Sequence, residues 1–102
     1  MSFRVRFTPE AEDDLVRLYD FLLQREDDGW AVADRAIDAI RNGIALLETS
    51  PFNCRKATPS NSFLRELIIS FGAAGYVALF EIEDEKTVTV LAVRHQREDD
   101  YH

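Results

Sequence analysis

The sequence is short of cysteine, histidine and long apolar runs. Cys54 is the only cysteine, so no disulfide can form within the chain, and a reducing cytoplasm is the expected compartment. No apolar run approaches the roughly 18 residues that a membrane span needs, and the first six residues alternate apolar and charged side chains, unlike a secretory signal. His95 and His102 have no third histidine beside them, so we expect no metal site and no cofactor.

Positive charge is also scarce, because 19 acidic residues outnumber 12 basic ones and leave a net charge of -7. Phosphate binding needs lysines and arginines that release counterions, so a chain this acidic is repelled by bulk nucleic acid. Any contact with nucleic acid or with another acidic partner must come from a local group of cations. The candidate cations are Arg55, Lys56, Arg65, Arg94 and Arg97.

The first quarter of the chain predicts a strand followed by a helix. With 102 residues, 46% of them apolar and 30% charged, we expect one globular domain over residues 1–102. Apolar and basic side chains alternate over residues 3–7, which is typical of a half-buried strand. Thr8 and Pro9 suit the cap and the first position of a helix, and acidic residues follow where the helix dipole favours them. This helix should run to about Arg25.

A second helix is predicted from its apolar spacing. Apolar side chains recur at steps of three and four, the pattern by which one helix packs lengthwise on another. These residues are Trp30, Ala33, Ile37, Ile40, Ile44 and Leu47. The short turn at residues 26–29 makes the two helices an antiparallel hairpin, and Trp30 is expected in the core. Ser50 and Pro51 end the helix, and residues 51–62 are expected to form a loop.

The last forty residues predict three strands, at Phe63–Ile69, Tyr76–Ile82 and Thr87–Val93, with a polar turn at 83–86. The expected fold class is therefore α+β: an N-terminal strand, an antiparallel helical hairpin, and then a three-stranded antiparallel sheet. The last two strands are apolar on both faces. We expect Leu79, Leu91 and Val93 on one face, and Phe80, Val90 and Ala92 on the other. Because the hairpin covers one face only, we expect a partner protein to cover the second face.

The third strand leads into a cationic cluster, Arg94-His95-Gln96-Arg97, and the chain ends with Tyr101 and His102. If the strand continues, at most two of the three cationic side chains share a face. The cluster is a candidate for contact with a target or partner, or it is surface decoration. His95 titrates near pH 6.5 when unperturbed and could serve as an acid–base residue. Arg65, between Leu64 and Glu66, is either a contact residue or a structural arginine.

Several phrases resemble the ParE/RelE family of bacterial toxins over essentially the whole chain. They are Thr8-Pro9-Glu10-Ala11, Ser50-Pro51, Leu64-Arg65-Glu66-Leu67, Gly75-Tyr76 and Val93-Arg94-His95-Gln96-Arg97. The resemblance implies a small cytoplasmic toxin of a type II toxin–antitoxin pair, of the kind also called plasmid stabilization proteins. It implies a cognate antitoxin as partner, whose segment would bury the uncovered sheet face, and no membrane association.

The resemblance also implies two alternative activities. RelE-like members cut messenger RNA on the ribosome with basic residues on the middle strands, an arginine after the Gly-Tyr pair, and a C-terminal arginine and tyrosine. Here Val77 follows Gly75-Tyr76, and Ile68 and Ser70 stand where that branch has lysines. The ParE-like branch, which poisons DNA gyrase by binding it, is therefore favoured, with the cationic residues named above, His95 and Tyr101 as contacts. In the nuclease alternative the catalytic set is Arg65, His95, Arg97 and Tyr101. A homologue that binds an antitoxin without being toxic is the third alternative.

Overall fold

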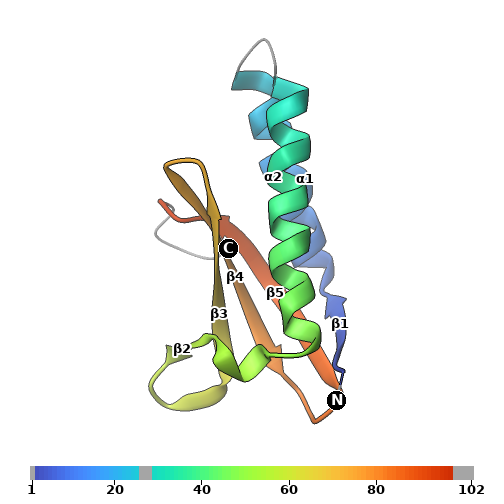
Figure 1. Cartoon of the computed structure of the whole chain (residues 1–102), viewed down its shortest axis with the longest axis vertical. Coiled ribbons are helices and arrows are strands. Elements are labelled where there is room, and N and C mark those ends of the chain that lie inside the picture. The colour runs from blue at the N-terminus through green and yellow to red at the C-terminus, as the bar shows by residue number, and fades with distance from the viewer. Residues whose placement is uncertain (1, 26–28, 98–102) are drawn as a thin grey trace.

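A mixed sheet of five strands carries a helical hairpin on one face (Figure 1). The computed structural model describes residues 2–25 and 29–97. The strands are β1 (Arg4–Phe7), β2 (Arg55–Thr58), β3 (Asn61–Phe71), β4 (Ala74–Ile82) and β5 (Thr87–His95). Their order across the sheet is β1-β5-β4-β3-β2. Strands β2 to β5 pair antiparallel, whereas β1 lies parallel to β5, with Val5 opposite Val88. The α+β prediction is confirmed, and the sheet is larger than the three antiparallel strands expected.

The two helices form the expected hairpin. Helix α1 spans Pro9–Arg25 and α2 spans Gly29–Ala45, followed by two short 3-10 turns, η1 (Leu46–Glu48) and η2 (Pro51–Asn53). The Thr8 hydroxyl accepts a hydrogen bond from the Ala11 amide at 3.1 Å, so Thr8 caps α1 as its position predicts. In Figure 1 the end of the hairpin where α1 meets α2 projects beyond the sheet.

The core lies between the helices and the covered face of the sheet. Its sheet side includes Leu67 and Ile69 of β3, Phe80 and Ile82 of β4, and Val88 of β5. On the helix side, the buried core residues include Ala11, Leu18, Ala36, Ile40 and Ile44. Alternation along β3 and β4 therefore places Ile68, Val77 and Leu79 on the opposite face, which no helix covers in the described part of the chain.

Two predicted placements are wrong. Trp30, which was expected in the core, is 65% exposed. It lies in the first turn of α2, where the hairpin projects past the sheet, so its side chain has no strand to pack against. Residues 51–62 are not all loop, since they contain η2, β2 and the first residues of β3. Strand β2 has the sequence Arg-Lys-Ala-Thr, which lacks alternating apolar residues, and it lies at the sheet edge.

A bulge in β5 changes which face each residue occupies. Leu79 lies opposite Ala92, whereas the next residue, Phe80, lies opposite Val90, so Leu91 is an extra residue in β5. The extra residue returns Val93 to the covered face, where it is fully buried in the core, and turns Ala92 to the other face. The prediction that Val93 shares a face with Leu79, and Ala92 with Phe80, is therefore wrong.

Candidate functional site at the C-terminal end of the sheet

Helix α1 holds the bulge in β5 in place just before the cationic cluster. The buried Asp14 carboxylate accepts a hydrogen bond from the Val93 amide at 2.9 Å. Thr8 donates its hydroxyl to the Leu91 carbonyl at 3.3 Å, and its own amide donates to the Val90 carbonyl at 3.0 Å. Because a bulge disrupts the ladder locally, these contacts, two from side chains and one from the Thr8 amide, supply partners for its backbone. The sequence placed Asp14 among acids that favour the helix dipole and gave no sign of this long-range role.

Arg94 and His95 are consecutive strand residues and therefore point to opposite faces, and the bulge decides which face each one takes. Arg94 lies opposite Val77 on the face without helices, and its guanidinium donates to the carbonyls of His95 and Gln96, at 3.2 and 3.5 Å. His95 lies opposite Tyr76 on the covered side, with its ring edge-on to the tyrosine at a centroid distance of 5.6 Å. The Arg97 amide donates to His95 Nδ1 at 3.1 Å, which fixes this nitrogen as an acceptor.

His95 and Arg97 line a cleft of about 940 Å³ between the projecting hairpin and the β3–β4 turn. Phe21 and Leu22 of α1 and Phe71 of β3 supply its apolar wall, and Arg17 of α1 adds another cation. Burial raises the pKa of the Tyr76 hydroxyl, so the phenol stays protonated at neutral pH. The cleft therefore combines an apolar wall with cationic groups, an arrangement suited to an apolar segment that carries an acidic side chain.

The turn beside this cleft depends on two glycines. Gly72 has a φ of 63°, in the left-handed region, within the turn between β3 and β4. Gly75 has a φ of 159°, and a Cβ there would collide with the Ile69 carbonyl oxygen of the paired strand. The Gly75-Tyr76 pair thus lets β3 and β4 approach closely and places Tyr76 against His95.

Arg65 lies elsewhere and makes internal contacts. Its guanidinium donates to the carbonyls of Ser62, Phe52 and Cys54, at 2.8, 3.1 and 2.7 Å, and it lies over the Phe52 ring at 5.3 Å. Arg65 lies opposite Phe80 of β4, whereas His95 lies opposite Tyr76, four residues away on the same strand. At about 3.3 Å per residue, that is roughly 13 Å along the strand. The structure does not bring Arg65 together with His95.

Arg55 and Lys56 lie on edge strand β2. The Arg55 guanidinium pairs with the Glu66 carboxylate at 3.0 Å, and the Lys56 side chain is exposed. Arg55, Glu66, Leu79 and Ala92 follow one another across four strands. At about 4.8 Å per strand, Arg55 is roughly 14 Å from β5. Lys56 lies opposite Arg65 across the β2–β3 pair. The predicted cations thus form two groups, one of Arg55, Lys56 and Arg65 near the β2 edge and one of Arg94 and Arg97 at the end of β5. Tyr101, the remaining predicted contact, lies outside the described residues.

Other chemistry finds little support in the part of the chain that the structure describes. Burial raises the pKa of the Cys54 thiol, with the Arg65 guanidinium acting in the opposite direction, so the thiol is protonated at neutral pH. Within residues 2–25 and 29–97, no group of three His, Cys, Asp or Glu side chains could hold a metal ion. Among the same residues, neither helix is long and apolar enough to cross a membrane.

Comparison with known proteins agrees with this fold. The family described as the ParE toxin of the type II toxin–antitoxin system parDE matches residues 5–100. The chain is 36% identical over 95 residues to "Toxin RelE3" of Caulobacter vibrioides, covering 92% of this chain and 95% of that one.

Solved structures show the same architecture. A chain from the chromosomal ParDE system of P. aeruginosa superposes with a TM-score of 0.74 at 18% identity, over 92% of this chain and 96% of that one. A conserved hypothetical protein from Helicobacter pylori gives a TM-score of 0.54 at 17% identity, over 96% and 98% of the two chains. With the family match spanning nearly all of its length, the chain belongs to the ParE/RelE family of type II toxin–antitoxin toxins.

Proposed function

We propose that this protein is a toxin that binds and inhibits DNA gyrase in the cytoplasm, as one domain over residues 1–102, and that a cognate antitoxin neutralises it. The observation that carries the choice of target is the composition of the face without helices. Ile68, Val77 and Arg94 lie opposite one another there, and Ser70 lies opposite Gly75. Only one of these five positions has a charged side chain.

Messenger RNA cleavage without a metal needs several groups close together. A base must take the 2′-hydroxyl proton, an acid must protonate the leaving oxygen, and cations must hold the phosphate. Val77 is 2% exposed and Ile68 is 44% exposed, and both side chains are apolar. Neither can therefore act as the base, act as the acid or hold the phosphate. Together with the separation of Arg65 from His95, these residues favour binding over cleavage.

The second candidate is a ribosome-dependent nuclease, because the relative from Caulobacter vibrioides has the name RelE3. In that case His95, Arg97 and Tyr101 act without Arg65. A purified-component experiment separates the candidates: supercoiling by gyrase, and mRNA integrity in a translating extract, each measured over the same range of protein concentration. Gyrase inhibition with intact mRNA supports the proposal. Codon-specific cleavage that Arg97→Ala abolishes would replace it with the nuclease, and inactivity in both assays would favour an inactive antitoxin-binding homologue.

The antitoxin is proposed to cover the face without helices. On this face Ile68 is exposed and Leu79 is half-buried, whereas Val77 and Ala92 are already buried. The solvent-exposed apolar surface is therefore smaller than the sequence suggests. An amphipathic helix on Ile68 and Leu79, continued as a strand along the open edge of β1 or β2, would fit this surface.

The matched test of this placement uses two aspartate substitutions. Ile68→Asp should weaken the antitoxin complex, because it puts a charge into the covered surface, whereas Leu46→Asp, at a residue 59% exposed in η1, should not. Affinity is measured with the cognate antitoxin. Hydrogen exchange at β4 and β5 should also slow when the antitoxin binds. Equal affinity of the two variants would place the antitoxin elsewhere.

A further inference from the structure

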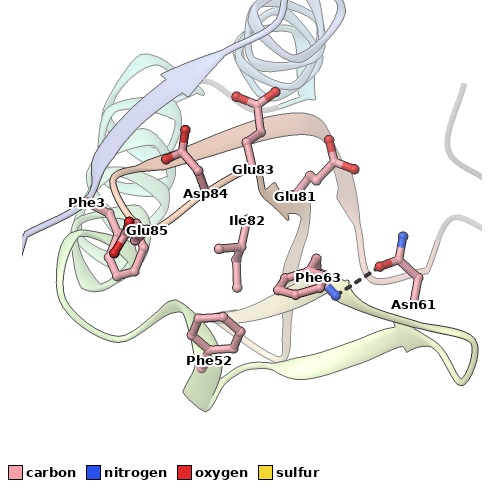
Figure 2. Close-up of a pocket in the computed structure, with 9 residues that line it drawn as sticks. All are labelled: Phe3, Phe52, Asn61, Phe63, Glu81, Ile82, Glu83, Asp84 and Glu85. Atoms are coloured by element: carbon pink, nitrogen blue, oxygen red, sulfur yellow. Dashed lines mark hydrogen bonds between the residues drawn. The ribbon is translucent and has the colours of Figure 1, made fainter.

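A second apolar hollow lies at the other end of β4 from His95. It has a volume of about 820 Å³ and lies where η2, the start of β3 and the end of β4 meet. Figure 2 shows Phe52, Phe63 and Ile82 around its centre, with Phe3 at one side. Phe52 is 49% exposed and Phe63 is 52% exposed. Two phenylalanines half in water beside a buried isoleucine form an apolar floor that the folded chain leaves open.

The floor is held in place without a ligand. The Phe52 and Phe63 rings meet edge to face at 6.2 Å, and the Arg65 guanidinium lies over the Phe52 ring. Arg65 also binds the Phe52 carbonyl, and Asn61 accepts a hydrogen bond from the Phe63 amide at 2.9 Å (Figure 2). A partner that binds here therefore loses little free energy to ordering these side chains.

The margin of the hollow is acidic. Its charged lining residues are Glu81, Glu83, Asp84 and Glu85, and none of the described residues that line it is basic. Lys86, the nearest cation along the chain, lines a neighbouring hollow with Arg4. The Asp84 carboxylate accepts a hydrogen bond from the Lys86 amide at 2.8 Å, which fixes the turn that carries these acids.

We propose that this hollow docks a cationic polypeptide segment of a partner protein, which seats one aromatic or aliphatic side chain on the Phe52–Phe63–Ile82 floor and places Lys or Arg against the carboxylates. Charge complementarity selects this occupant. A second copy of the chain also has a net charge of -7 and is repelled. Nucleic acid and anionic lipid are repelled for the same reason. A small polycation would leave the apolar floor wet. The site does not depend on gyrase as target.

The experiment titrates the 15N-labelled full chain with the end-capped tripeptide Lys-Trp-Lys and follows amide shifts by NMR. Shifts should concentrate at Asn61, Phe63 and residues 83–85. The affinity should fall when NaCl rises from about 50 to about 300 mM, because salt screens charges near a surface. Lys-Ser-Lys should bind about tenfold more weakly, since it lacks the apolar anchor, and Glu-Trp-Glu should not bind.

Two charge-matched variants locate the site. Glu83→Gln with Glu85→Gln should lower the affinity for Lys-Trp-Lys at least threefold. Glu10→Gln with Glu12→Gln, in the exposed first turn of α1, should leave this affinity unchanged. Phe63→Ser should lower the affinity for the peptide without changing how that affinity depends on salt. Absent or scattered shifts, equal affinity of the two double variants, or spermidine binding at the same residues as tightly as the peptide would each overturn the proposal.

Discussion

Asp14 provides a sharp test of how the helix positions the cationic end of the sheet. Asp14 is 5% exposed. Its carboxylate accepts a hydrogen bond from the Val93 amide and lies 3.8 Å from the Arg17 guanidinium. Val93 is fully buried, so no water replaces the carboxylate easily. Asp14→Ala removes the acceptor and leaves a buried amide without its partner at the bulge that decides which face Arg94 and His95 each occupy.

The magnitude follows from that hydrogen bond. A bond to a charged group contributes about 1.5–3 kcal/mol, and a buried unpaired donor costs about 1–3 kcal/mol. The two ranges describe the loss of the same hydrogen bond and are not added. Asp14→Ala should therefore lower the free energy of unfolding by about 2–3 kcal/mol. For a domain near 100 residues each kcal/mol lowers Tm by about 4–8 °C, so the midpoint should fall by about 8–24 °C. Asp14→Asn keeps an oxygen acceptor and should lose about half as much.

Asp13→Ala is the matched control, because the neighbouring aspartate is exposed and has the same charge and nearly the same place relative to the helix dipole. It should cost under about 1 kcal/mol. Urea denaturation followed by circular dichroism gives both values, and the amide exchange rate of Val93 should rise in Asp14→Ala alone. If Asp14→Ala and Asp13→Ala agree within about 0.5 kcal/mol, the contact with Val93 does not stabilise the bulge.

Three further predictions concern the other end of the sheet. Arg65→Ala should lower the free energy of unfolding by about 2 kcal/mol, with Arg65→Lys intermediate, because lysine lacks the planar fork that reaches three carbonyls; equal stability of all three proteins would contradict this. Cys54 should react with iodoacetamide more slowly than free cysteine at the same pH, and urea should remove the difference; a faster reaction would refute the burial effect. The Lys86 amide lowers the pKa of Asp84 from 3.8, so this carboxylate stabilises the fold above pH 3.8 and the stabilisation is lost as pH falls through the lower folded pKa. Asp84→Asn should remove that part of the acid unfolding profile, and an unchanged profile would count against the contact.

The elements with strong local signals were predictable from the sequence. The Thr8 cap, both helices and the three C-terminal strands follow from capping residues and apolar spacing, and each strand proves longer at one or both ends. Strand β2 was missed because an edge strand needs backbone pairing more than an apolar face. The parallel pairing of β1 with β5 depends on long-range packing, which the alternation in β1 does not encode.

The candidate site was less predictable, because the bulge is a long-range feature. Nothing near Leu91 in the sequence indicates an extra residue; the partners that stabilise it come from Thr8 and Asp14, about eighty positions away. The sequence located the cationic cluster and predicted by alternation that it divides between two faces, whereas the face that each residue takes depends on the bulge. The sequence is compatible with Arg65 as a contact residue or as a structural arginine, and its three internal carbonyl partners give it the structural role.

The supercoiling assay with charge-matched variants tests the proposed action on gyrase most directly. We expect the wild type to inhibit purified gyrase. Arg94→Ala with Arg97→Ala should raise the half-inhibitory concentration at least about tenfold, since each lost charge-assisted hydrogen bond costs about 1.5–3 kcal/mol. Arg4→Ala with Arg6→Ala, which removes two exposed charges from edge strand β1, should inhibit like the wild type. Thermal melting confirms that each variant is folded. Absence of inhibition by the wild type, or equal inhibition by both folded double variants, would rule out gyrase inhibition through Arg94 and Arg97.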